Sequence, residues 1–295
     1  MERQGALEEL SDHVVIFNCN EKVAKIVEEL HTGTLPDPVD VVLVCRSIAM
    51  WEAHPKWHPR GGEGEGHFFV VEGNPTNQED LLEVGTARAR AAVILADPEQ
   101  GELADARSTL VAMAIERQNP QVHTVMELIA SQNRVHLKTT GVNEVVCLGE
   151  LSEKLIAQSC ITPGVKNIFH HLLSSREDTN QIFVRPLPPA LAGLSYREIA
   201  GRFIRSSVPC ILCGFGKLGA SSSGAQKRRS FASRVFVVNP RAGGDPGKNT
   251  RLLEGDQLLV IAREPPELEE ICSSIPAAAA HPPGGGGVPE DPPGP

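Results

Sequence analysis

The residues most suggestive of chemistry lie near the start of the chain, in a turn between an apolar segment and a helical one. A dinucleotide-binding turn reads G-x-G-x-x-G, because its glycines permit a tight turn and let the backbone approach a pyrophosphate. Here the three glycine positions hold Asn18, Asn20 and Val23. Asparagine tolerates positive φ, so the turn can still form, but a side chain at position 20 would crowd a pyrophosphate. These residues argue against hydride chemistry and in favour of sensing.

A literal G-x-G-x-x-G occurs later in the chain, from Gly214 to Gly219. That fingerprint requires a helix that opens at the third glycine, because the helix N-terminus supplies the anion site. The residues that follow, 220–230, are rich in Ser, Gly and Arg and show no apolar periodicity. We therefore predict a flexible hairpin loop here, not a phosphate cradle.

Cys210 and Cys213 have the spacing of half a zinc or redox motif. No second pair and no nearby histidine completes the motif. Both cysteines alternate with apolar residues in a predicted strand, which favours a packing role. Trp51 and Trp57, with histidines around them, fall in a polar insertion that we predict to be a solvated loop.

The segments that must position these residues alternate between strands and helices. Six apolar segments have the length and composition of strands: Val14–Phe17, Asp40–Cys45, His67–Glu72, Ala91–Ala96, His123–Leu128 and Glu144–Cys147. Strands that alternate with helices predict a parallel sheet covered on both faces. The fold class is therefore α/β, a Rossmann-like doubly wound parallel sheet followed by a small α+β C-terminal subdomain.

The chain divides into five predicted parts. They are an N-terminal linker (1–10), a Rossmann-like lobe (11–150), interface helices and a linker (151–180), the α+β subdomain (181–272) and a disordered Pro/Gly-rich tail (273–295). The helices over 151–173 carry more apolar residues than packing on one sheet requires, which is typical of a subunit interface. The tail has the low-complexity composition of disordered segments.

The bulk composition restricts the class of protein. The chain has 295 residues, 41% of them hydrophobic, and a formal net charge of −9. That charge argues against nucleic acid as a partner. The apolar runs are strand-sized, so we expect no transmembrane segment, and the acidic N-terminus does not read as a signal peptide. An odd number of cysteines, seven, suits a reducing compartment. We expect a cytoplasmic protein.

Several motifs, in their order and spacing, carry a resemblance to a known family. They are Asp12-His-Val-Val-Ile16, Gly73-Asn-Pro-Thr76, the run Leu81–Leu95, Thr140-Gly-Val-Asn-Glu-Val-Val146 and the run Leu253–Ala262. From about Ser11 to Glu270 the chain resembles the regulator of potassium conductance (RCK) domains of ligand-gated potassium channels and the related Trk-type potassium uptake regulators.

The resemblance implies a cytoplasmic gating or regulatory domain that controls a potassium or other cation channel or transporter. It would act through ligand-dependent movement of a homo-oligomeric ring, at the inner face of a membrane, on a pore supplied in cis or in trans. The resemblance also implies that the chain is not an enzyme. Two alternatives stay open: an NAD(P)-dependent oxidoreductase with a degenerate fingerprint, and a ligand-free Rossmann-like assembly scaffold.

The resemblance also places a ligand crevice at the carboxyl ends of the first, second and fourth strands. The residues expected around it are Asn18, Cys19, Asn20, Cys45, Arg46, Asn74, Asp97 and Glu127. Nucleotide-binding members of the family keep an acidic residue for the ribose where this chain has Cys45-Arg46. Arg46 could meet a phosphate instead, or be an ordinary surface arginine.

In calcium-gated members of the family, carboxylates at the ends of the fourth and fifth strands coordinate the ion. The matching residues here are Asp97 and Glu127, with Asp105 as a further candidate ligand. Calcium takes roughly six to eight oxygens, so scattered acids make a poor cage. The cofactor therefore stays open between Ca²⁺, an adenine nucleotide and none.

Overall fold

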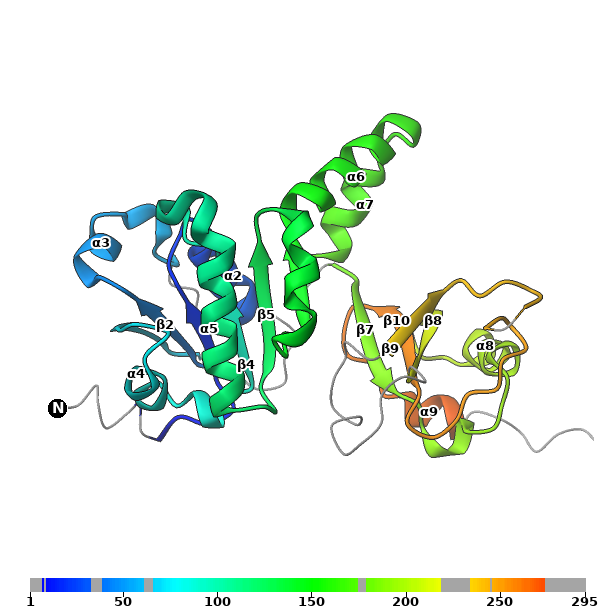
Figure 1. Ribbon diagram of the computed structural model, residues 1–295. Coiled ribbons are helices and arrows are strands. Elements are labelled where there is room, and N and C mark those ends of the chain that lie inside the picture. The colour runs from blue at the N-terminus through cyan, green and yellow to red at the C-terminus, as the bar shows by residue number, and fades with distance from the viewer. Residues whose placement is uncertain are drawn as a thin grey trace, which may run out of the picture.

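The computed structural model describes residues 7, 9–32, 39–60, 66–174, 179–218, 234–244 and 246–273. Their strands form two sheets, which lie in separate bodies (Figure 1). The first has six strands in the order β3-β2-β1-β4-β5-β6 and the second has four in the order β7-β10-β8-β9. All pairs in the first sheet are parallel, so the α/β, Rossmann-like prediction is confirmed.

The first body is the N-terminal lobe. Its strands are β1 (Val14–Phe17), β2 (Val41–Cys45), β3 (Phe68–Glu72), β4 (Ala91–Ile94), β5 (His123–Leu128) and β6 (Glu144–Cys147). Its α-helices are α2 (Val23–Thr32), α3 (Ile48–Glu52), α4 (Gln78–Glu83) and α5 (Ala104–Gln118). Short 3₁₀ helices cover Pro55–Trp57, Thr86–Arg88, Pro98–Leu103 and Ser131–Thr139.

Alternate side chains of the strands point to opposite faces of the parallel sheet, and each face has its own core. Val15 and Phe17 of β1 pack with residues of α4 and α5. Val14 and Ile16, which point the opposite way, pack with residues of α2 and α3. Because both faces are covered, β1 and β2 are buried along their whole length.

The strand order reverses direction between β1 and β4, which are neighbours in the sheet although they are far apart in sequence. The end of β1, Phe17, lies between Val44 of β2 and Ile94 of β4. In open parallel sheets, the place where the order reverses leaves a crevice at the carboxyl ends of the strands. Asn18, Asn20, Arg46, Asp97 and Glu127 lie at this end of the sheet.

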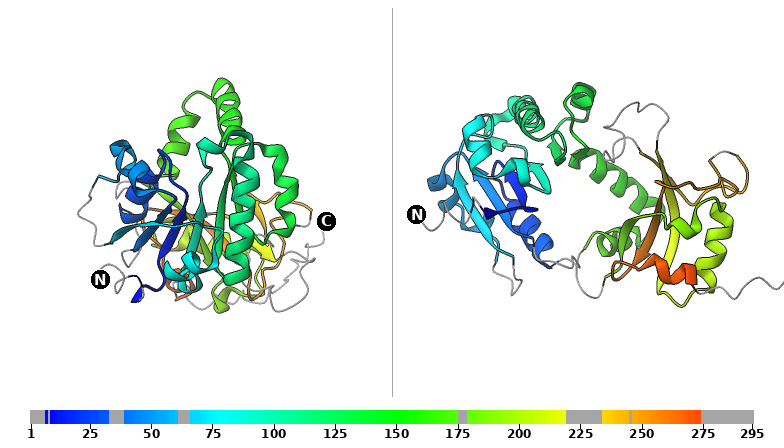
Figure 2. Two further views of the ribbon diagram at one scale, coloured as in Figure 1. Left: turned by 60° about the vertical axis from the view of Figure 1, so that its left-hand side comes forward. Right: turned by 90° about the horizontal axis from the view of Figure 1, so that it is seen from below.

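Two helices link the lobe to the second body: α6 (Leu148–Ile161) and α7 (Val165–Leu172). They project from the lobe as a helical pair, and the views in Figures 1 and 2 agree that they stand between the two sheets. Neither helix has a buried residue. None of the described helices is both long enough and apolar enough to cross a bilayer.

The second body is an antiparallel α+β module. Its elements are β7 (Gln181–Pro186), a 3₁₀ turn (Pro189–Leu191), α8 (Tyr196–Arg205), β8 (Cys210–Leu218), β9 (Arg234–Val238), β10 (Gln257–Ala262) and α9 (Leu268–Ser273). A capping box starts α8, because the Ser195 hydroxyl accepts from the Glu198 amide while the Glu198 carboxylate accepts from the Ser195 amide. Residues of α8 and α9 cover one face of this sheet and form a single core with it.

The glycine-rich motif is the clearest correction to the sequence prediction. Gly214 and Gly216 do not lie in a flexible loop but within β8, where they pair with Val238 and Phe236 of β9. A Cβ on Gly214 would run into the carbonyl oxygen of Val237, so glycine is required there by close strand approach. Gly219 and the loop predicted after it lie outside the described residues.

The Trp-containing insertion is also more ordered than we predicted from sequence. It folds into α3 and the 3₁₀ turn Pro55–Trp57, and Trp51 is only 5% exposed. The Ser47 side chain caps α3 by accepting from the Met50 amide. The segment Ser131–Thr139 is a 3₁₀ helix.

The buried face of α5 combines small and apolar side chains: Ala104, Asp105, Ser108, Val111, Ala112 and Ile115. Val111 and Ile115 have the i, i+4 spacing of a helical face that packs against a core. Leu103 and Leu110 are exposed.

Most of the predicted linker (1–10) and all but the first residue of the predicted tail (273–295) lie outside the described residues, as do residues 175–178 of the second linker.

Candidate functional site

The turn after β1 is built by Asn18 in the left-handed conformation, with φ of 65°. This is the conformation for which a dinucleotide-binding turn uses glycine, and asparagine is among the few other residues that adopt it. The Asn18 side chain is buried, and its Nδ2 donates to the Leu95 carbonyl oxygen at 2.8 Å. The side chain therefore ties the end of β1 to the segment after β4.

The Asn20 side chain makes a second hydrogen bond across the same crevice. Its Nδ2 donates to the Ala96 carbonyl oxygen at 2.9 Å, and its Oδ1 accepts from the Lys22 amide at 3.0 Å. That amide belongs to the turn that opens α2, one of the free donors by which a helix N-terminus binds anions. In this chain the Asn20 side chain satisfies the donor, so part of the anion site is already filled.

Two ion pairs close the crevice further. Arg46, directly after β2, pairs with the largely buried carboxylate of Asp97 beyond β4. Lys22, at the start of α2, places its Nζ 2.9 Å from Oε1 of Glu127 on β5. Glu127 also accepts the Ala96 amide at 3.1 Å through Oε2. Both predicted carboxylates are thus in the crevice, and each already faces a cationic side chain.

Asp105, the third predicted calcium ligand, has a different partner set. Its Oδ1 accepts the Ile129 amide at 2.8 Å, and its Oδ2 accepts the Ala130 amide at 3.0 Å and Nδ2 of Asn133 at 2.8 Å. The carboxylate thereby fixes the chain just beyond β5 to the first turn of α5. In the described part of the chain, no three His, Cys, Asp or Glu side chains are grouped to hold a metal ion. The structure therefore does not assemble the three predicted acids into one cation site.

Cys19 and Cys45 belong to the same buried core cluster. Neither forms a disulfide, and their residues are 5% and 0% exposed. The Cys19 thiol donates a hydrogen bond to the sulfur of Cys45, which lowers the pKa of the Cys45 thiol against the opposing effect of burial. Where a nucleotide-binding lobe would present a carboxylate, this chain has a thiol pair.

Asn74 is the predicted site residue that stays apart from the others. Its side chain is exposed, and its Oδ1 accepts from the amide and the hydroxyl of Thr76 at 3.2 and 2.9 Å. Asparagine side chains commonly close such local turns. Asn74 therefore shapes the loop between β3 and α4 and does not point into the crevice.

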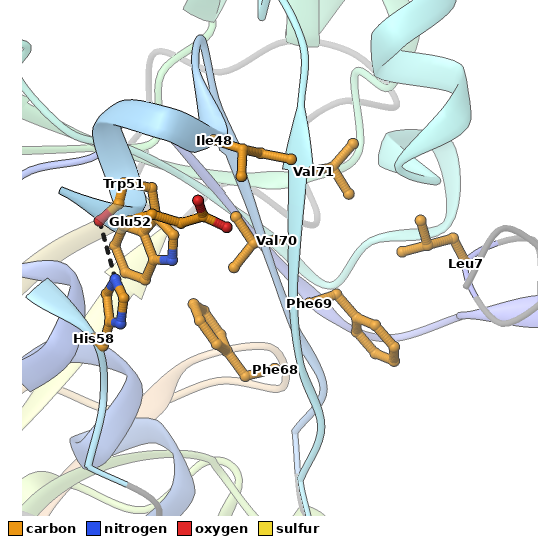
Figure 3. Close-up of a pocket in the computed structure, with 9 residues that line it drawn as sticks. All are labelled: Leu7, Ile48, Trp51, Glu52, His58, Phe68, Phe69, Val70 and Val71. Carbon is orange, nitrogen blue, oxygen red and sulfur yellow. Dashed lines mark hydrogen bonds between the residues drawn. The ribbon is translucent and has the colours of Figure 1, made fainter. Parts of the chain in front are cut away.

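A separate hollow of about 450 Å³ runs along β3, at the edge of the parallel sheet. Figure 3 shows Trp51, His58 and Phe68 on one side of the strand and Phe69, Val71 and Leu7 on the other. The rings of Trp51 and His58 stack with centroids 4.5 Å apart, and Nε2 of His58 lies 3.0 Å from the Trp51 carbonyl oxygen. These histidines and tryptophans therefore pack the sheet edge and take no part in the crevice.

Lys22 is the crevice residue that sequence reasoning did not single out. It stands at an x position of the fingerprint, and its partner Glu127 lies four strands along the chain. A lysine at the start of a helix faces a position where the helix dipole favours anions. That unfavourable placement is the signal in the sequence that could have indicated a carboxylate partner.

The comparisons with known proteins agree with the resemblance seen in the sequence. Residues 9–126 match the family model of the calcium-activated potassium channel slowpoke-like RCK domain. The calcium-gated potassium channel TvoK of Thermoplasma volcanium is 26% identical over 223 residues, which cover 74% of this chain and 60% of that protein. The solved human SLO3 gating ring matches with a TM-score of 0.56 at 18% identity, over 89% of this chain and 46% of that one. The chain thus spans less than two thirds of each of these relatives.

Proposed function

We propose that the chain is a regulatory domain that controls a potassium channel or transporter from the cytoplasmic side, on the premise that residues 9–126 match the RCK family model. The match to the RCK family model is the observation that carries the proposal. TvoK is named as a calcium-gated potassium channel and the human relative as a gating ring. A regulatory role accounts for a Rossmann-like lobe whose crevice is retained while its fingerprint is lost.

The exposed surface of α6 and α7 supports an oligomeric ring. Apolar side chains are exposed along both helices and just beyond: Leu148, Leu151, Ile156, Ile161, Ile168, Phe169 and Leu173. A helix pair that buries no residue in its own chain gains nothing from the hydrophobic effect until another surface covers it. We propose that a second copy covers it.

Other exposed apolar residues are consistent with more than one contact between copies. Leu103, Leu110 and Met113 are exposed on and beside α5, well apart in sequence from α6 and α7. A closed ring requires each subunit to contact neighbours through at least two patches. The exposed apolar surfaces of α5 and of the α6–α7 pair are two such patches on one subunit.

The oxidoreductase alternative is not favoured by the comparisons, and the crevice gives a physical reason. The Asn20 carboxamide stands where a dinucleotide would need bare backbone, and its oxygen caps the Lys22 amide. We therefore propose that the chain is not an enzyme of this class. Thermal unfolding with NAD(H) and NADP(H) should show no stabilisation by any of the four forms.

Any ligand of the crevice must compete with its ion pairs. A cation would have to take Asp97 from Arg46, and a nucleotide phosphate would have to take Arg46 from Asp97. A ligand shifts a gating equilibrium only by its difference in affinity for the two states. We propose that breaking the Arg46–Asp97 pair is the event that couples ligand binding to movement of the lobe.

Light scattering on the full chain tests the ring. The wild type should have a mass above that of the monomer, and Ile168→Lys on α7 should lower it. Ile204→Lys is the matched control, because Ile204 is an exposed isoleucine on α8 outside the proposed contact. A chain that is strictly monomeric at high concentration would contradict the ring.

Potassium flux through a chimera tests the regulatory role. The pore of TvoK, joined to this chain in place of its own gating region, is reconstituted in vesicles. We expect flux to depend on an intact ring, so that Ile168→Lys changes flux and Ile204→Lys leaves it unaltered. Equal flux through the wild-type and Ile168→Lys chimeras would contradict the proposal.

A further inference from the structure

The thiol pair at the crevice is formed by residues from neighbouring strand ends. Cys45 is the last residue of β2, and Cys19 comes two residues after the end of β1. The register pairs Phe17 with Val44, so the chain beyond each strand stays adjacent. Both side chains belong to the core cluster on the α2 side of the sheet, and the Cys19 thiol donates to the Cys45 sulfur. The two cysteines are therefore neighbours in one core cluster, at adjacent strand ends.

Backbone spacing allows a bond between them. Neighbouring strands lie about 4.7–4.9 Å apart, and disulfides join residues whose Cα atoms are usually about 4.4–6.8 Å apart. Continuing the register that pairs Phe17 with Val44 places Asn18 opposite Cys45, and Cys19 is the next residue along the chain. The pair thus needs a small adjustment of the turn and no rearrangement of the sheet.

The pKa of the Cys45 thiol is shifted in the opposite direction from the pKa values of three partly buried thiols. Donation from Cys19 lowers its pKa, whereas burial raises the pKa of the Cys210, Cys213 and Cys272 thiols. The thiolate is the form that attacks an oxidant. The thiol whose pKa is lowered is therefore the one that has a second thiol beside it in the core.

We propose that Cys19 and Cys45 form a reversible oxidation site, at which hydrogen peroxide joins the two thiols in a disulfide. The Cys45 thiolate attacks one peroxide oxygen, the O–O bond breaks, and a sulfenic acid and hydroxide result. The Cys19 sulfur then attacks the sulfenic sulfur and expels the second hydroxide. Each hydroxide takes one thiol proton, so the thiols lose two electrons and two protons and the peroxide becomes two waters.

The position of Cys19 connects this chemistry to the crevice. Cys19 lies between Asn18 and Asn20, whose side chains hold the Leu95 and Ala96 carbonyl oxygens. Moving Cys19 toward Cys45 moves the backbone that carries both asparagines. The disulfide itself does not rest on the proposed function, because it is detected chemically whether or not the chain forms a ring.

Peptide mapping of the full-length chain tests the site. The Cys160→Ser background is used, because Cys160 is exposed and would form links between chains. The folded protein is treated with hydrogen peroxide, unfolded, alkylated and digested. We expect one major cross-linked product that joins the peptides containing Cys19 and Cys45, lighter by two hydrogens and reversed by dithiothreitol. Finding both cysteines still alkylated when other core thiols have been oxidised would overturn the proposal.

Two further measurements separate this site from general oxidation. In Cys19→Ser the resolving thiol is missing, so Cys45 should accumulate as a sulfenic acid that dimedone traps. Cys210 and Cys213 are the internal control, because three residues along β8 separate their Cα atoms by about 10 Å. A Cys210–Cys213 disulfide, or equal dimedone labelling of all core thiols, would show that the reaction is unselective.

Discussion

The two sheets differ in how many of their faces are covered. Helices cover the parallel sheet on both faces, and each face has its own core. The antiparallel sheet has one core, with α8 and α9 on one face. On its other face Ile182 and Ile211 are 50% and 66% exposed. The lobe is complete by itself, whereas the module retains an apolar face that another surface can cover.

The register shows that this exposed face is continuous. Ile261 of β10 pairs with Ile182 of β7 and with Ile211 of β8, so the three isoleucines form a row across three strands. Residues that pair directly across strands point to the same side of a sheet. The contrast between the sheets can therefore be tested residue by residue.

The largest effect should come from a buried isoleucine of the parallel sheet. Ile16→Ala removes a fully buried side chain from the α2 side of the lobe, and we expect a loss of about 2–5 kcal/mol in the free energy of unfolding. Ile211→Ala, on the open face, should cost less than about 0.5 kcal/mol. Urea unfolding at low protein concentration measures both. Equal losses would mean that the open face is covered and would contradict the contrast between the two sheets.

Gly214→Ala should come next and act on the module alone. The added methyl meets the Val237 carbonyl oxygen of β9, and overpacking of this kind costs about 1–3 kcal/mol. Gly243→Ala is the control, since nothing lies near that position. Both tryptophans, Trp51 and Trp57, are in the lobe, so tryptophan fluorescence should report an unchanged lobe while circular dichroism reports the weakened module. A shift of the fluorescence transition would show that the two bodies unfold together.

Asp105→Asn should weaken the lobe by a smaller amount. The variant keeps one acceptor oxygen but loses the charge that strengthens three hydrogen bonds to the chain beyond β5. We expect a loss of about 1 kcal/mol, seen by tryptophan fluorescence. If Asp105 were a calcium ligand, the wild type would gain stability from added Ca²⁺ and the variant would not. We expect neither protein to respond through this residue.

The smallest effect should be a pH dependence that originates in the lobe. Burial lowers the pKa of His13, whose Nε2 donates to the Val84 carbonyl oxygen at 2.9 Å. The unfolded chain therefore binds this proton more readily than the folded one. Stability should be complete above the ordinary value of about 6.5 and should fall as the pH drops below it toward the folded value. His13→Gln, which keeps a donor, should reduce this slope, and an unchanged slope would assign it to other groups.

Sequence reasoning predicted the lobe well because its strands are short apolar runs between strong turn signals. The limits of β1, β5 and β6 agree residue for residue with the prediction. It failed at β8, where glycines that permit close strand approach resemble those of a loop. The predicted domain boundaries stay a prediction.

The crevice was predicted in part. Placing Asn18, Asn20, Arg46 and Asp97 at the ends of parallel strands follows from the fold. The partners of their side chains do not, since a sequence pattern cannot show that Arg46 meets Asp97 or that Lys22 meets Glu127. The Asp105 carboxylate accepts two backbone amides. A carboxylate with such partners has the same sequence signal as one that binds an ion, and the calcium role of Asp105 stays a prediction.

The four side-chain ties across the crevice join the β1–β2 side of the lobe to the β4–β5 side. These side-chain contacts would compete with any free ligand for the same groups, as groups tethered within one molecule. A tethered group keeps a fixed effective concentration, commonly about millimolar for short tethers, however far the protein is diluted. The apparent dissociation constant of a free ligand would be its intrinsic value divided by the fraction of molecules whose ion pairs and hydrogen bonds across the crevice are open. The lobe would thus respond over a higher range of ligand concentration than a crevice without these side-chain contacts.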